Sequence, residues 1–326
     1  ANTHTEDDMT GRSMTNLLHE AEDIVRRAVN AGPGGRVVAC GTGATGAIDR
    51  LQQILGVALS PVTRRRLFEA LGPEAAANAH EQLERQRPVV FVGPYEHHSN
   101  EVTWREGLAT VLTVDLAADG GIDLGHLESL LRDPAFQGRP RNGSFSAASN
   151  VTGMVSPVHD IARLLHRHGA NACFDSAASA PYVGIDMCPG PDPDGGDPSL
   201  DAVFLSPHKF IGGPGTPGLL VFNERIYARD LPPTVAGGGT VDYVGYRSHD
   251  FVADIEERER AGTPGVLQML KAALVFAIKE SVGVDRIHAR ERELTGRALE
   301  RWGRLPRVEI LGNPDPDRRV AIIGFN

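Results

Sequence analysis

Lys209 follows an apolar, strand-like run at residues 201–205 and precedes a loop rich in glycine and proline. Most lysines stay on the solvated surface, but neighbours of this kind would remove water from the amine. Desolvation lowers the pKa of a lysine and leaves a neutral amine that can attack an aldehyde. One lysine is a weak signal, so its interpretation depends on residues elsewhere in the chain.

Asp175 ends the apolar run at residues 170–175, which is typical of a buried strand that delivers a carboxylate to the edge of a sheet. A carboxylate there can keep a pyridine nitrogen protonated, and the protonated ring withdraws electrons from a carbanion. A helix cap or turn residue is the alternative, because Ser176 and a run of small residues follow. Together, Lys209 and Asp175 favour a pyridoxal phosphate site.

A glycine-rich turn at residues 40–46 follows a strand-like run and opens a stretch with a helical apolar period. Backbone N–H groups at such a helix start bind phosphate. Gly41, Gly43 and Gly46 also satisfy the dinucleotide fingerprint, so an NAD(P) or FAD oxidoreductase is an alternative. That alternative requires an acidic residue after a second strand about 20 positions further on. The chain instead has three arginines at residues 64–66 with no strand-like run before them.

Two adjacent histidines, His97 and His98, follow the strand-like run at residues 89–93. An imidazole at this edge of a sheet can stack on a pyridine ring and can move a proton near neutral pH. Metal binding is the alternative, but neighbouring side chains point in different directions and no cluster at ligand spacing completes a site. We therefore predict no metal site.

Taken in order, these motifs resemble the class V aminotransferase family of fold-type I pyridoxal phosphate enzymes, nearest to the cysteine desulfurases and selenocysteine lyases. The resemblance involves most of the chain. It implies a three-layer α/β/α fold with a mostly parallel seven-stranded sheet and a smaller C-terminal α+β domain. The segments that carry it are residues 43–46, 96–100, 149–153, 174–177, 206–209 and 261–264.

The resemblance also implies roles for individual residues. Lys209 would form the Schiff base with pyridoxal 5'-phosphate and shuttle the alpha proton of the substrate. His97 would stack on the ring, Asp175 would bind its nitrogen, and Asn150 would lie near the ring and the substrate carboxylate. The other implied cofactor-binding residues surround the phosphate: Gly43, Ala44, Thr45, Ser206, His208 and, reaching from the neighbouring subunit of a homodimer with shared active sites, Thr263.

The chain departs from the family pattern at two places. Relatives usually carry a glutamine three residues after the ring carboxylate, where this chain has Ala178. We expect this contact to be missing or to come from Ser176 or Ser179. Desulfurases also need a sulfur-accepting cysteine and a carboxylate-binding arginine, both normally in the C-terminal domain, and neither is in the visible chain.

The three cysteines do not supply the sulfur-accepting role. We expect Cys40 and Cys173 to be inert core residues, because both lie in apolar strand-like runs, and Cys188 to be exposed. Three cysteines without an even framework fit a reducing cytoplasm, where we expect the protein to be.

We therefore expect an enzyme that acts on a small amino acid such as L-cysteine, cleaves a C–S or C–Se bond and passes sulfur to an acceptor protein. An aminotransferase or another lyase of the same fold is the alternative, because it would use the same residues. A catalytically silent relative is a third. The net charge of −9 argues against a nucleic-acid partner, and no apolar segment of the sequence is long enough for a membrane helix.

The 326 residues are enough for one large α/β domain, which we place at residues 1–285, and the beginning of a small domain at 286–326. Both ends look clipped relative to the family, and His4 would then match a histidine near the substrate. We expect a Pro/Gly/Asp-rich surface insertion at residues 186–198. The seven expected strands lie at residues 36–39, 89–92, 110–116, 143–148, 172–175, 202–206 and 218–222.

Overall fold

A central seven-stranded sheet organises the computed structural model, which describes residue 5 and residues 7–326. His4 lies outside these residues. The sheet has the order β1-β7-β6-β5-β4-β2-β3. Its strands are β1 (Gly35–Cys40), β2 (Val89–Val92), β3 (Thr110–Thr113), β4 (Arg141–Ser146), β5 (Asn171–Asp175), β6 (Ala202–Leu205) and β7 (Gly218–Asn223). All seven expected strands are present, with shifts of up to three residues at their ends.

Four of the six strand pairs are parallel, and β7 alone runs against both of its neighbours, β1 and β6. As a result β1, β2, β4, β5 and β6 all end at the same edge of the sheet. The residues that follow these strands are the ones that the sequence motifs singled out, so the topology gathers them at one edge.

Helices cover both faces of the sheet, and the predicted α/β/α fold class is confirmed. The helices are α1 (Met9–Ala28), α2 (Gly43–Ile54), α3 (Pro61–Leu71), α4 (Pro73–Gln86), α5 (Val102–Glu106), α6 (Leu124–Arg132), α7 (Val158–Arg167), α8 (Ile255–Arg258), α9 (Val266–Val282) and α10 (Val284–Trp302). Side chains alternate along each strand: Val203 and Leu205 pack in the core with α1, α6, α7 and α9, whereas Ala202 and Phe204 pack with α2, α5 and α8.

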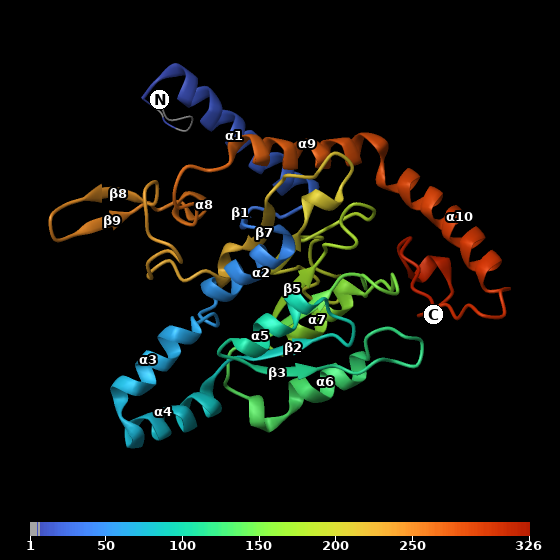
Figure 1. Ribbon diagram of the computed structural model, residues 1–326, viewed down its shortest axis with the longest axis horizontal. Helices are drawn as coiled ribbons and strands as arrows, with labels where there is room; N and C mark the ends of the chain where they lie inside the picture. Colours follow the sequence, from blue (N-terminus) through green and yellow to red (C-terminus); the bar gives the residue numbers. More distant parts are fainter. Residues whose placement is uncertain (1–4, 6) are drawn as a thin grey trace.

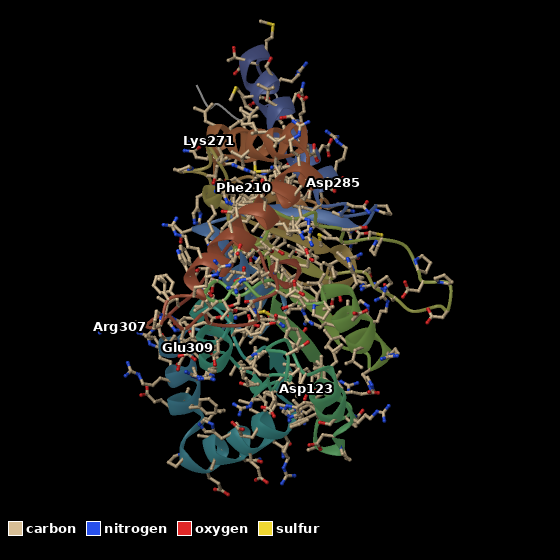
Figure 2. The ribbon with its side chains drawn as sticks, turned by 90° about the vertical axis from the view of Figure 1, so that its right-hand side faces the viewer. Asp123, Phe210, Lys271, Asp285, Arg307 and Glu309 are labelled. Atoms are coloured by element: carbon tan, nitrogen blue, oxygen red, sulfur yellow. The ribbon has the colours of Figure 1, made fainter. Side chains whose placement is uncertain are left out.

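Three segments extend from this body. The helices α3 and α4 form an arm with no buried residue, and a two-stranded hairpin, β8 (Val241–Val244) with β9 (His249–Phe251), projects on the same side of the view (Figure 1). Residues 186–198 form a loop that extends from the body, as expected for a surface insertion (Figure 2).

The last residues return to the sheet edge. Val320 N–H donates to the carbonyl of Gly153, 2.9 Å away, and the Arg319 guanidinium donates to the carbonyl of Thr152. The C-terminal segment therefore packs on the loop that carries Asn150, and the division into domains at residue 285 stays a prediction. No helix in the described part of the chain is long and apolar enough to cross a membrane.

Candidate active site

A cavity of about 160 Å³ lies at the edge of the sheet where the parallel strands end. Nine of the ten residues singled out from the sequence line it, and Thr263 does not. The walls come from five separate parts of the chain. The lining residues are Thr42, Gly43, Ala44, Thr45, His97, Ser99, Ser146, Ala148, Asn150, Asp175, Ala177, Ala178, Ser206, His208 and Lys209.

The first wall is the start of α2. Ala44 N–H donates to Ser206 Oγ at 2.9 Å, which ties the helix to the end of β6. Gly43 has a φ of +58°, and a Cβ added there would lie 2.7 Å from His208 Cε1. This close approach requires glycine. The helix therefore opens on the cavity with its positive dipole end and with hydroxyl and imidazole groups beside it, an arrangement that suits a phosphate.

The second wall carries His97, in the loop after β2. Ser99 N–H donates to His97 Nδ1 at 3.2 Å, and Ser99 Oγ lies 2.6 Å from Thr45 Oγ1. Because Nδ1 accepts a hydrogen bond, the neutral imidazole carries its proton on Nε2. These contacts join the histidine loop to the start of α2, so the proposed ring and phosphate contacts form one unit.

Asp175 is buried at the end of β5, and its Oδ1 accepts a hydrogen bond from Ala177 N–H at 2.9 Å. Burial raises the pKa of this carboxyl group, against the opposing effects of the Ala177 N–H and the positive charges of Lys209 and His97. No hydrogen bond among the described residues involves Oδ2. One oxygen of the carboxylate is therefore left for a donor in the cavity, as a pyridine N–H would be.

Lys209 lies at the end of a 3-10 turn, Pro207–Lys209, and is exposed. The prediction that apolar neighbours remove water from the Lys209 amine is therefore wrong for the single chain. Of the two apolar residues that follow Lys209, Ile211 is exposed and Phe210 is buried in another direction. Phe210, labelled in Figure 2, is 5% exposed and packs on Phe276 of α9 with ring centroids 4.8 Å apart. Its burial anchors the turn and leaves the lysine at the cavity.

Glu96 was not singled out from the sequence as a site residue. Its Oε1 accepts from the N–H groups of Gly93 at 3.1 Å and Ser146 at 2.9 Å. Its Oε2 accepts from Ser146 Oγ and from Asn100 Nδ2, each at 2.7 Å. The sequence pattern, a glutamate before two histidines in a polar loop, is typical of a solvated side chain. The only signal was its place directly before His97.

The position of the expected glutamine holds Ala178, which lines the cavity. Neither Ser176 nor Ser179 lines the cavity, and the Ser179 hydroxyl donates to the Ser176 carbonyl at 3.5 Å. Of the two expected outcomes, a missing contact or a serine in its place, the structure favours the missing contact, because both serines are buried.

The cysteines lie where the sequence indicated. Cys40 and Cys173 are buried and Cys188 is exposed, and none of them lines the cavity. Burial raises the pKa of the Cys40 thiol to about 12 and also raises that of Cys173. Neither thiol is a reactive nucleophile in this state.

The topology does not fit the dinucleotide fingerprint. That motif belongs to a unit in which the strand after the helix pairs in parallel with the strand before it. Here β1 pairs antiparallel with β7 and does not pair with β2. The glycine turn is therefore part of a different fold.

The sequence profile described as Aminotransferase class-V matches residues 72–326. The chain therefore belongs to the class V aminotransferase family. A probable cysteine desulfurase of Halalkalibacterium halodurans is 28% identical over 241 residues, which cover 73% of this chain and 55% of that protein. One of Streptomyces coelicolor is 30% identical over 243 residues, covering 72% and 54%. The chain thus spans about half the length of these relatives.

Solved structures share the fold. The cysteine desulfurase of Thermococcus onnurineus superposes with a TM-score of 0.77 at 19% identity, over 100% of this chain and 72% of that one. A cysteine desulfurase of Escherichia coli gives a TM-score of 0.74, also at 19% identity, over 100% and 71%.

Proposed function

We propose that this protein is a pyridoxal 5'-phosphate-dependent enzyme that acts on a small amino acid and cleaves a carbon–sulfur bond, as a cysteine desulfurase does. The observation that carries the proposal is the cavity in which nine residues from five separate segments meet. A phosphate-binding helix start, a flat imidazole, a buried carboxylate and a lysine in one cavity are the groups this cofactor needs.

The residues fit the cofactor in three ways. The start of α2, with Thr45, Ser206 and His208, would bind the phosphate. His97 would stack on the ring, and the free oxygen of Asp175 would accept a hydrogen bond from its nitrogen. When bound, the cofactor supplies an aldehyde that condenses with amines and a ring that withdraws electrons. Asp175 in its ionised form would hold the proton on the ring nitrogen.

Lys209 is the residue that we propose to bind the aldehyde and, once the substrate amine has replaced it, to move the alpha proton. Its position at the cavity on a turn anchored by Phe210 supports both roles. Asn150, which also lines the cavity, would orient the substrate carboxylate. Because no cysteine of the described chain lines the cavity, the sulfur acceptor in this proposal comes from another part of the protein or from a partner protein.

We further propose a homodimer in which Thr263 reaches the phosphate of the neighbouring subunit. Thr263 is exposed and lies three residues before α9. On α9, Leu267 is 70% and Leu274 is 60% exposed, and nearby Ile211 is 87% exposed. Apolar side chains gathered in this way are typical of a protein interface. Within each subunit, residues 1–285 would form the large domain and 286–326 the start of the small one.

The test is an absorption spectrum of the purified protein with pyridoxal phosphate, before and after borohydride, for wild type, Lys209→Ala and the control Lys271→Ala. We expect a visible band that borohydride removes in wild type and control and that is missing in Lys209→Ala. With L-cysteine, sulfide release supports the desulfurase, whereas transfer of the amino group to a keto acid would support the aminotransferase alternative. A protein that stays colourless would refute the proposal.

A further inference from the structure

Glu96 is surrounded by donors. Two backbone N–H groups, one hydroxyl and one amide donate to its two oxygens, at 2.7 to 3.1 Å. Only an ionised carboxylate accepts from all four, since a protonated carboxyl or an amide would direct a hydrogen at another donor. The surroundings of this side chain are therefore built for a negative charge.

The orientation of one donor is itself fixed by buried groups. Asn100 Oδ1 accepts from Ser144 Oγ at 2.5 Å and from Trp104 Nε1 at 3.2 Å, so its amide nitrogen must face Glu96. Asn100, Ser144 and Trp104 are all fully buried. Buried networks of this kind hold their members in one arrangement because any unpaired member would be costly.

The network connects the histidine loop to the sheet. Glu96 directly precedes His97, and its donor Ser146 ends β4 beside Asp175 of β5. We infer that Glu96 is a positioning residue: its ionised side chain holds the loop after β2 against the end of β4 and so fixes His97 in the cavity wall. The inference deepens the proposed function, since it concerns how the ring-binding histidine is held.

A pH dependence follows. Burial raises the pKa of Glu96 to about 7, and the negative charge of Asp175 adds to the effect, against the hydrogen bonds from Ser146 and Asn100. The neighbouring titratable groups are Asp175 at the end of β5, and Tyr95 and His97 in the same loop. As the pH falls through 7, Glu96 takes up a proton and loses at least one of its four hydrogen bonds. The loop should then be held less firmly.

The first test needs no cofactor. Trp104 and Trp302 are the two tryptophans of the chain, so the Trp104 indole N–H signal can be assigned in a nitrogen-15 NMR spectrum with Trp302→Phe. We expect this signal to shift with pH, with a midpoint near 7, in wild type and in the control Glu106→Gln. In Glu96→Gln the shift should disappear. A wild-type titration in Glu96→Gln would overturn the inference.

The second test uses bound pyridoxal phosphate. Circular dichroism of the visible band, per mole of cofactor bound, reports how the ring is held. We expect it to fall at least twofold in Glu96→Gln, toward the value of His97→Ala, and to stay unchanged in Glu106→Gln. If Glu96 contributed only to stability, Glu96→Gln would lower the melting temperature and leave the circular dichroism per mole of bound cofactor unchanged. That result would overturn the inference.

A third variant, Ser146→Ala, tests the inference if the Glu96→Gln protein does not fold. Ser146→Ala removes one donor to the ionised carboxylate, so the midpoint of the Trp104 titration should move upward; an unchanged midpoint would contradict the inference. If wild type binds no cofactor, the proposed function fails, whereas the Trp104 titration still decides whether Glu96 holds this loop.

Discussion

Ser206 Oγ accepts a hydrogen bond from the backbone N–H of Ala44 at 2.9 Å, although 162 residues separate them. The contact joins the start of α2 to the turn that carries Lys209. It makes the phosphate wall and the lysine parts of one structure, because a shift of either one breaks the bond.

Replacing this hydroxyl tests the link. Ser206→Ala leaves the buried Ala44 N–H without its acceptor, so we expect a loss of about 1–3 kcal/mol in the free energy of unfolding. We also expect pyridoxal phosphate to bind about tenfold more weakly, in line with about 1.4 kcal/mol. Chemical unfolding and a binding titration measure both effects. Ser60→Ala, at an exposed serine with no capping hydrogen bond, is the control and should change neither.

Two glycines of the same turn give a matched pair. A Cβ at Gly43 would meet His208 Cε1 at 2.7 Å and the φ there is +58°, whereas a Cβ at Gly41 would meet nothing within 4 Å. We expect Gly43→Ala to lower the free energy of unfolding by about 1–2 kcal/mol and to abolish cofactor binding. Gly41→Ala should bind normally. Equal effects of the two substitutions would show that the turn does not shape the cavity.

The buried charge of Asp175 should lower the stability of the folded protein, although the proposed function requires it. Its pKa is raised by burial, so the folded protein binds the proton more tightly than the unfolded chain does. The stability that this group contributes therefore falls as the pH rises from the pKa of Asp175 in the unfolded chain through its pKa in the folded protein. Above the folded pKa the contribution stays reduced. Asp175→Asn removes the buried charge and should raise the melting temperature of the cofactor-free protein at pH 8.

The difference between Asp175→Asn and wild type should shrink as the pH falls toward 3.8, the ordinary value for an aspartate. With cofactor, the same variant should lose at least a hundredfold in turnover, because a neutral amide does not hold the ring proton. Thermal scans at several pH values and a sulfide assay measure the two effects. A variant that keeps full activity would exclude Asp175 from the proposed role.

Lys279 of α9 gives a prediction outside the cavity. Its ammonium group donates to the carbonyls of Ala180 and Val183, and burial lowers its pKa from 10.5 to about 8. Between pH 8 and pH 10.5 the unfolded chain binds more protons at this group, so stability should rise with pH relative to Lys279→Met. Urea unfolding of both proteins across this range measures the difference. If the difference in the free energy of unfolding between wild type and Lys279→Met does not change with pH, the lowered pKa of Lys279 is contradicted.

Much of the fold could be predicted because the strands are buried on both faces and read as short apolar runs between turns. Val89–Val92 is such a strand, with four buried residues in a row. The hairpin of β8 and β9 could not be predicted, because its residues are mostly exposed and carry no apolar period. The arm of α3 and α4 was missed for the same reason, since no buried face marks either helix.

The candidate site could be predicted where a residue ends a strand, as Asp175 does, or lies in the loop after one, as His97 does. Two features could not. Glu96 is a site residue only because β4, 50 residues away, presents Ser146 to it. The exposure of Lys209 depends on the turn at residues 207–209, which buries the neighbouring Phe210 instead.

The antiparallel strand β7 also sets an order of events during synthesis. Within the described residues, β1 pairs with β7 and with no other strand. The ribosome must therefore pass Asn223 before β1 has a sheet to join, roughly 10 to 40 s after β1 is made at about 5–20 residues per second. Until then the glycine turn and α2 have no β7 to pack on, and the apolar side chains of β1 stay exposed in the nascent chain, as in the folding intermediates that chaperones bind.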